Sequence, residues 1–213
     1  MKKLVISIFM FFAMVNTLAE NVKSNPYPDL QGKIIKEIKY TDKTGDNVIV
    51  LTKTDIITKK CEYSDECGSQ DMFVYRYLNN QGQMQKKWQM RDFIHDCEFA
   101  PFEIKPFFDL IKISDENHNQ IKEVWIPYQL DCRNDPGPTQ TKIIAYEDTQ
   151  KYALRGMSRE WVGGCEVSGG EYTMDENLKQ STLLKKFAES LWKQINANFA
   201  KQAEEICKAQ SSQ

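Results

Sequence analysis

The sequence LIKISDENHNQIKEVWIPYQL, residues 110–130, decides the fold that we expect. Its second half carries apolar or aromatic side chains at every second position: Val124, Ile126, Tyr128 and Leu130. This spacing is typical of a strand with one buried face. An acidic, amide-rich segment, residues 115–120, separates it from a preceding apolar segment. The stretch therefore predicts two antiparallel strands joined by a polar loop.

The loop has a candidate metal site. Asp115, Asn117 and Asn119 place oxygen-bearing side chains at alternate positions, and Glu123 follows eight residues after Asp115. Calcium loops use this spacing because alternate residues of a tight turn converge on one point. Asparagines replace two aspartates of the strong motif, and Gln120 replaces its glycine, which weakens binding. We expect a plain hairpin turn, with a weak calcium site of Asp115, Asn117, Asn119 and Glu123 as the alternative and no other cofactor.

Similar patterns on both sides of this stretch predict two four-stranded antiparallel meanders. The first, within residues 33–98, has expected strands at 33–40, 48–51, 72–78 and 84–90. The second, within residues 104–156, has them at 108–113, 122–130, 142–146 and 152–155. Asp42 and Cys61 correspond to Asp115 and Cys132, which indicates a weak internal repeat; coincidence among short hairpins is the alternative. Packing of the two units like propeller blades is one arrangement compatible with this pattern.

The period changes near the C-terminus. Residues 161–170 hold four glycines and Cys165 and are expected to form a loop. Apolar residues then recur every three or four positions: Leu184, Phe187, Leu191, Ile195 and Phe199. This spacing predicts an amphipathic helix over 175–208, capped by Thr173 or Asp175. The predicted class is α+β: antiparallel meander sheets with one long C-terminal helix covering a sheet face.

Residues 1–19 have the order of a secretory signal peptide: two lysines, an apolar segment and small residues before Glu20. A buried N-terminal helix is the alternative. Residues 20–32 are polar, with two prolines, and are expected to be a flexible lead-in. Residues 33–213 then form a single domain. No later segment is apolar enough to predict a transmembrane helix.

Charge disfavours nucleic acid as a partner. The chain has 28 basic and 30 acidic residues, and loss of residues 1–19 removes two lysines and no acid. The remaining chain carries a net charge of −4, whereas nucleic-acid-binding proteins usually have a basic surface.

Six cysteines follow the predicted cleavage site, and an even number in an exported chain predicts three disulfides. Six cysteines allow fifteen pairings. We expect one pair to close a small polar loop, one to join the two meanders, and one to attach the helix end to the glycine-rich segment. These pairs are Cys61–Cys67, Cys97–Cys132 and Cys165–Cys207. A metal site is less well supported, because the chain has two histidines and no Cys-x-x-Cys.

Catalytic signatures are weak. Asp92, Asp96 and Glu98 lie beside His95, and a pair of carboxylates could serve a glycosidase. The same segment is also typical of a strand that ends at a disulfide. Ser168 lacks a Gly-x-Ser-x-Gly context. We therefore assign no catalytic residue.

Several stretches resemble a family of exported bacterial proteins labelled surface polysaccharide biosynthesis protein. They are residues 44–47 (TGDN), 91–93 (RDF) with Cys97, the Asp115 loop leading into 123–125 (EVW), 128–133 (YQLDCR) and 151–156 (KYALRG). The similarity extends over residues 35–195. Family members tend to have Asp-x-Asp-x-Asp-Gly at the Asp115 loop, from which this chain departs. The resemblance implies a link to cell-surface glycans and brings no catalytic residues.

These observations favour an exported protein, periplasmic or secreted, that acts as a non-catalytic binding or accessory module for a glycan or an envelope protein. The alternative is a hydrolase or transferase acting on surface glycan. Two carboxylates converging in a cleft would favour the enzyme, whereas scattered acids would favour the binding module.

Overall fold

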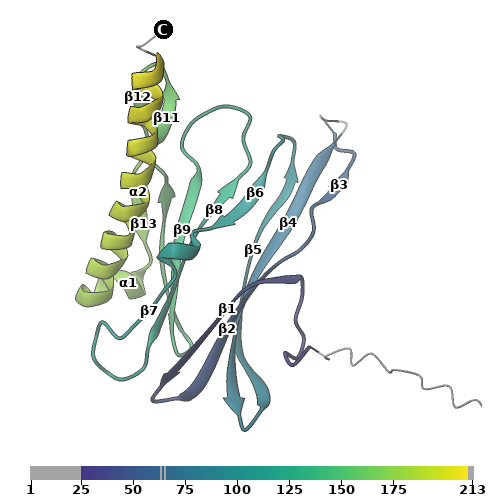
Figure 1. Cartoon of the computed structure of the whole chain (residues 1–213), viewed down its shortest axis with the longest axis vertical. Coiled ribbons are helices and arrows are strands. Elements are labelled where there is room, and N and C mark those ends of the chain that lie inside the picture. Colours follow the sequence, from purple (N-terminus) through teal and green to yellow (C-terminus); the bar gives the residue numbers. More distant parts are fainter. Residues whose placement is uncertain (1–24, 63, 65, 211–213) are drawn as a thin grey trace, which may run out of the picture.

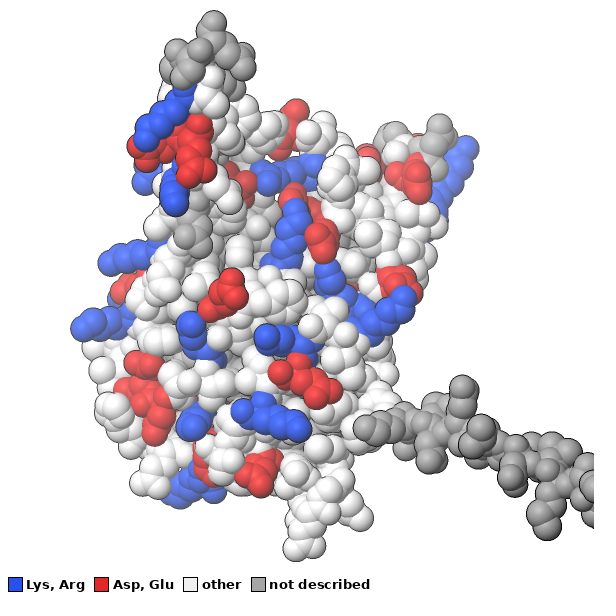
Figure 2. Space-filling view, viewed as in Figure 1, with Lys and Arg blue, Asp and Glu red and all other residues white. Residues whose placement is uncertain are grey.

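The computed structural model describes residues 25–62, 64 and 66–210, and consists of two antiparallel sheets with a long C-terminal helix (Figure 1). The predicted α+β class is confirmed. The predicted signal peptide, residues 1–19, lies outside the described residues. On the face in Figure 2, basic and acidic side chains are intermixed over both sheets.

The first sheet is a meander in which strand β4 is central. Its strands are β1 (Lys33–Asp42), β2 (Gly45–Lys53), β3 (Ile57–Lys59), β4 (Cys67–Asn80) and β5 (Gln83–Cys97). β4 pairs along one edge with β2 and β3, and along the other with β5. β1 pairs with β2. The order β1-β2-β4-β5 is the predicted four-stranded meander.

The second sheet repeats this order and adds an edge strand. It contains β6 (Glu103–Pro106), β7 (Lys112–Ser114), β8 (Glu123–Asp131), β9 (Gln140–Glu147), β10 (Gln150–Met157) and β13 (Tyr172–Met174). β6 and β7 pair with the two ends of β8. The strand predicted over 108–113 is wrong at its start, where Phe108–Leu110 forms a 3₁₀ turn, η1. The N–H of Leu110 bonds to the carbonyl of Phe107 (2.9 Å), which ends the ladder there.

The two sheets pack face to face, which is also how neighbouring propeller blades pack, so the blade-like arrangement stays a prediction. Their inner faces are both apolar, so each buries the other. The first sheet contributes Ile49, Leu51, Met72, Val74 and Met90, and the second Val124, Ile126, Tyr128, Ile144 and Ala153. This shared core removes the apolar sides of both meanders from water, which is the main stabilising contribution to a sandwich.

The outer face of the first sheet is covered by the chain that leads into β1. Tyr27 is 6% exposed, and its ring lies 4.9 Å from that of Tyr77. Tyr77 donates its hydroxyl to the carbonyl of Pro28, and the N–H of Gln31 bonds to the hydroxyl of Tyr75, both at 2.9 Å. Of the lead-in predicted to be flexible, residues 20–24 lie outside the described part, and residues 27–31 are held by these contacts.

The outer face of the second sheet is covered by the C-terminal segment. This segment contains β11 (Glu160–Gly163), β12 (Glu166–Ser168), α1 (Glu176–Gln180) and α2 (Thr182–Gln210). β11 and β12 form a hairpin where the sequence predicts a loop. Asp175 caps α1 through the N–H of Leu178 (2.9 Å), and an extended residue, Ser181, separates the two helices. The predicted helix therefore exists as two segments, and α2 packs Leu184, Ala188, Leu191 and Ile195 against the sheet.

Three disulfides close within the structure, and their pairs are the expected ones: Cys61–Cys67, Cys97–Cys132 and Cys165–Cys207. Disulfides persist in oxidising compartments, so the chain has the chemistry of an exported protein. None of the helices in the described part of the chain is long and apolar enough to cross a membrane.

Candidate functional site

Three of the four predicted calcium residues, Asp115, Asn117 and Asn119, share one loop, and their side-chain oxygens accept hydrogen bonds from the backbone of that loop. Asp115 accepts hydrogen bonds from the N–H groups of Asn119 (3.0 Å) and Gln120 (3.1 Å). Asn117 Oδ1 accepts from the N–H of Asn119 (3.2 Å), and Asn119 Oδ1 accepts from that of Ile121 (2.8 Å). Such bonds from side chain to nearby backbone stabilise a tight turn. The oxygens therefore point at backbone donors rather than at one common point.

Glu123, the fourth predicted ligand, lies beneath this loop and is fully buried. Its Oε2 accepts from Ser114 Oγ (2.9 Å) and the N–H of Glu116 (3.0 Å), while its Oε1 has no partner among the described residues. Glu147 lies opposite on β9 and accepts from Asn117 Nδ2 (2.7 Å). Burial, and then the charge of Glu147, raise the pKa of Glu123. The loop thus covers two carboxylates, and Glu147 bonds to the amide nitrogen of Asn117, not its oxygen.

The acid cluster predicted on β5 does not converge. Asp92 points between the sheets, where Tyr128 (2.5 Å) and Lys142 (2.7 Å) donate to its Oδ2. Asp96 pairs with Lys59 at the surface (2.9 Å). The two carboxylates therefore serve separate ion pairs, and this segment does not present the carboxylate pair that a glycosidase needs.

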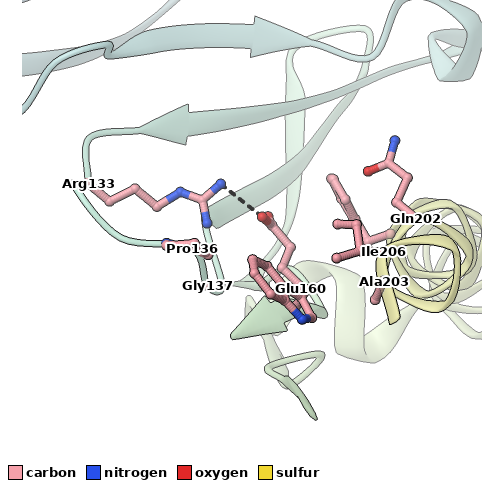
Figure 3. Close-up of a pocket in the computed structure, with 9 residues that line it drawn as sticks. Arg133, Pro136, Gly137, Glu160, Gln202, Ala203 and Ile206 are labelled. Atoms are coloured by element: carbon pink, nitrogen blue, oxygen red, sulfur yellow. Dashed lines mark ion pairs between the residues drawn. The ribbon is translucent and has the colours of Figure 1, made fainter. Parts of the chain in front are cut away.

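A hollow of about 140 Å³ lies where three segments distant in the sequence meet (Figure 3). The loop after β8 contributes Arg133, and the β11–β12 hairpin contributes Glu160 and Trp161. The last turns of α2 form the opposite wall with Phe199, Gln202, Ala203 and Ile206. One side of the hollow is therefore polar and charged, and the other is mostly apolar, which is the usual composition of a ligand site.

The polar side is a network centred on Arg133. Its Nε donates to Asp131 Oδ1 (2.9 Å), and its Nη2 pairs with Glu160 Oε2 (2.8 Å). Lys105 pairs with the other oxygen of Asp131 (3.0 Å), and Gln129 donates to Glu160 Oε1 (3.1 Å). The third nitrogen, Arg133 Nη1, is buried and has no acceptor among the described residues.

This network favours the charged forms of Asp131 and Arg133. Burial acts to raise the pKa of Asp131, but hydrogen bonds from Arg133 and Lys105 outweigh it and lower that pKa below its ordinary value. For Arg133, burial acts to lower the pKa, and the hydrogen bond to Asp131 and the charge of Glu160 raise it. The hollow therefore presents the Arg133 guanidinium beside Asp131, whose ionised form the network favours.

Local sequence explains how these residues are held. Arg133 follows Cys132, whose disulfide to Cys97 fixes the end of β8 to the first sheet. Trp161 donates its indole N–H to the carbonyl of Gly164 (2.7 Å), and Gly164 turns the hairpin at φ +53°. Cys165–Cys207 then ties this hairpin to α2. Two of the three disulfides thus hold walls of the hollow.

Sequence reasoning missed Arg133, Glu160, Trp161 and the helix residues as a site. They come from three segments and form no local motif. Two features of the sequence could have indicated the site. Arg133 directly follows Cys132, and Trp161 lies in a glycine-rich segment shortly before Cys165.

Chemically, this site can bind and orient a small polar molecule. Arg133 Nη1 can donate a hydrogen bond, the Glu160 carboxylate can accept one, and the Trp161 indole offers a flat apolar surface. Its lining includes no serine, cysteine or histidine that could act as a nucleophile or base.

Comparison with known proteins finds no similar protein: no family model, no curated protein and no solved structure matches this chain. The resemblance to surface polysaccharide biosynthesis proteins therefore stays a prediction.

Proposed function

We propose that this protein is an exported, non-catalytic module that binds a cell-surface saccharide in the hollow between Arg133, Glu160 and Trp161. The observation that carries this proposal is the buried Arg133 Nη1 without an acceptor. Buried N–H groups in proteins nearly always have a hydrogen-bond partner. In this proposal, an oxygen of the bound ligand supplies the acceptor that Nη1 lacks.

A saccharide fits the chemistry of the walls. Its hydroxyl groups can accept from Arg133 and donate to Glu160, and its C–H faces can pack on the indole of Trp161. The hollow of about 140 Å³ is smaller than the range of about 300–1,000 Å³ that is typical of drug-sized ligands. We therefore expect one terminal sugar residue to enter, rather than the middle of a chain.

The enzyme alternative is less well supported by the same geometry. A glycosidase needs one carboxyl group with a raised pKa to protonate the leaving group. Asp131 and Glu160 are both paired with Arg133, and the pKa of Asp131 is lowered. Glu123 has a raised pKa but no exposed surface. A binding role requires no proton transfer and uses the charged network as it stands.

The prediction is tested by calorimetric titration with neutral sugars (glucose, galactose, N-acetylglucosamine) and an acidic one (glucuronic acid). Ala203→Leu fills the hollow without removing a polar group, since Ala203 is 5% exposed and lines it. We expect at least one probe to bind and Ala203→Leu to weaken it about ten-fold or more, as a steric block of a small pocket should.

Ala197→Leu is the matched control, because Ala197 is exposed on the same helix and outside this hollow. It should bind like the wild type, with both variants melting within a few degrees of it. If Ala203→Leu does not fold, Gln202→Trp at the exposed rim replaces it. Equal affinity in the hollow-filling variant, or binding by none of the probes, would contradict the proposal. Release of reducing ends from an envelope polysaccharide would favour the hydrolase instead.

A further inference from the structure

Strand β5 is a free edge of the first sheet. It pairs with β4 along one side, and no strand in the described part of the chain pairs with its other side. Between Trp88 and Ile94 its pairing with β4 has no register shift. A regular, unpaired edge is a template for another strand.

The backbone groups of this edge can be assigned from the hydrogen bonds of its neighbour. Asp71 of β4 is opposite Phe93, and both its N–H and its C=O are directed to Thr54, away from β5. Residues opposite each other in an antiparallel pair alternate between bonded and non-bonded. Phe93 therefore points its backbone groups outward, where its N–H donates to Asp92 Oδ1 (3.0 Å), and the same alternation assigns Gln89 and Arg91 to the open side.

The open side lies above an uncovered part of the second sheet. β4 and β5 both approach β6, and β5 also lies over β8. Side chains of β5 reach further, to β9: Asp92 accepts from Lys142, and the rings of Trp88 and Tyr146 stack at 4.2 Å. The second sheet continues from β9 to β10 and β13, with no further strand of the first sheet above them. No strand of the described part of the chain thus occupies the position beside β5 over β10.

The inner face of β9 and β10 forms the floor of this position, and it is basic. Lys142, Lys151 and Arg155 belong to the same face of β9 and β10 as the buried Ala153. Lys142 pairs with Asp92, but Lys151 and Arg155 make no ion pair with any described residue. Burial, and then the charge of Arg155, lower the pKa of Lys151. Two adjacent cations therefore have no ion-pair partner among the described residues, although the charges of Asp92 and Asp175 act on Lys151 from a distance.

The floor is also hollowed. A depression of about 410 Å³ lies at the end of β10 and β13, and its lining includes Arg155, Met157 and Thr173 together with one acid, Glu171. Side chains of an added strand would find room there, whereas a flat, filled surface would exclude them.

We propose that the free edge of β5 binds an extended, acidic segment of a partner protein by strand addition, with carboxylates over Lys151 and Arg155. Main-chain hydrogen bonds to Gln89 and Arg91 would align the segment, and alternate side chains would face the floor. The other side chains of the segment would lie beside Phe93, which is 45% exposed and 5.2 Å from the Arg91 guanidinium. The expected segment therefore alternates acidic with apolar residues.

A second copy of this chain fits the position less well. The side chains of β5 that would face the floor are Trp88, Met90 and Asp92, so only one is acidic. Arg91 of the second copy would also meet Arg91 of the first across the new ladder, and like charges opposite each other are destabilising.

The test measures binding of a labelled peptide that alternates glutamate and valine to the folded, disulfide-bonded protein. Two controls are a peptide of the same composition with the glutamates in one block, and the alternating peptide N-methylated at the residues that would donate to β5. We expect the alternating peptide to bind and both controls to bind about ten-fold more weakly, because strand addition needs both the alternation and the N–H groups.

Variants of the protein separate the backbone from the charges. Gln89→Pro removes an outward N–H without breaking the bonds to β4, and proline is tolerated at such edge positions. Arg155→Glu reverses a floor charge, and Lys36→Glu makes the same change on exposed β1. Gln89→Pro and Arg155→Glu should each weaken binding of the alternating peptide about ten-fold, and Lys36→Glu should leave it unchanged.

Several outcomes would overturn the inference. One is that the N-methylated peptide binds as tightly as the unmethylated alternating peptide. This measurement tests the strand pairing even if Gln89→Pro fails to fold. A second is that polygalacturonate, an acidic polymer without a peptide backbone, binds as tightly as the peptide and that Gln89→Pro does not change its affinity. Charge alone would then explain the binding. Dimerisation through β5, detected by light scattering and abolished by Gln89→Pro, would assign the edge to a second copy. Absence of any peptide binding would also refute it.

Discussion

At the scale of single residues, Glu123 shows how burial changes the chemistry of an ordinary side chain. It begins β8 directly opposite Glu147, and two like charges at facing positions disfavour each other. Its carboxyl group is fully buried, with one oxygen unpartnered among the described residues. Both effects favour the protonated form, which is why its pKa lies above the ordinary value of 4.5.

This residue predicts a dependence of stability on pH. Because the folded-state pKa is raised, the folded protein binds the proton more tightly than the unfolded chain. The resulting stabilisation is fully present below pH 4.5 and is lost as the pH rises through the folded-state pKa. Glu123→Gln should remove this dependence, so its free energy of unfolding relative to wild type should rise with pH, by at most about 1.4 kcal/mol per pH unit.

Urea unfolding at a series of pH values from 4 upward measures this difference. Glu37→Gln, on the exposed face of β1, is the control and should run parallel to the wild type. A Glu123→Gln curve that also runs parallel would show that Glu123 is not the group responsible.

At the scale of elements, the disulfides differ in the length of chain that they close. Cys165–Cys207 spans 42 residues and joins the β11–β12 hairpin to the end of α2, whereas Cys61–Cys67 spans 6. A longer closed loop restricts the unfolded chain more. The two bonds should therefore contribute unequally to stability.

Replacing both Cys165 and Cys207 by serine should lower the free energy of unfolding by about 4 kcal/mol, and the same change at Cys61 and Cys67 by about 2 kcal/mol. Guanidinium-induced unfolding of the two double variants measures which one loses more free energy of unfolding. The first variant should also lose affinity for the saccharide, because α2 forms one wall of the hollow. Equal losses of stability would contradict the loop-length argument.

At the scale of the whole molecule, Arg76 joins the two sheets. It lies on β4 with its side chain 1% exposed. Its Nε donates to Asn47 Oδ1 (2.9 Å), its Nη2 to Thr44 Oγ1 (2.6 Å), and its Nη1 to Asp148 Oδ1 (2.6 Å) in the turn between β9 and β10. A buried guanidinium with all three nitrogens bonded couples the first sheet to a turn of the second.

Arg76→Ala should destabilise the protein by about 3–5 kcal/mol, because it leaves buried partners unsatisfied. Asp148→Ala should cost less, because Asp148 is 46% exposed and the buried guanidinium keeps its bonds to Asn47 and Thr44. Thermal unfolding of both variants, followed by near-UV and far-UV circular dichroism, gives the comparison. Similar small losses in both would show that Arg76 does not couple the sheets.

Short-range patterns predicted much of this fold. Alternation at Val124, Ile126 and Tyr128 predicted β8, and the same rule predicted the other long strands, because side chains alternate between the faces of a strand. The apolar period from Leu184 onward predicted α2. The 3₁₀ turn at Phe108–Leu110 was not predicted. Residues 108–113 are rich in apolar residues, and this composition suits a strand and a buried turn equally.

The sequence by itself determined where most of the long strands and helix α2 lie, which face of each is apolar, and that six cysteines would be oxidised. These properties depend on neighbours within a few residues and on the redox compartment. Only the tertiary structure decided that the sheets stack, that β5 keeps an open edge over Lys151 and Arg155, and that Arg133 meets Trp161 beside α2. These contacts depend on how segments distant in the sequence pack and on the disulfides that join them. The periodicity within one segment does not encode them.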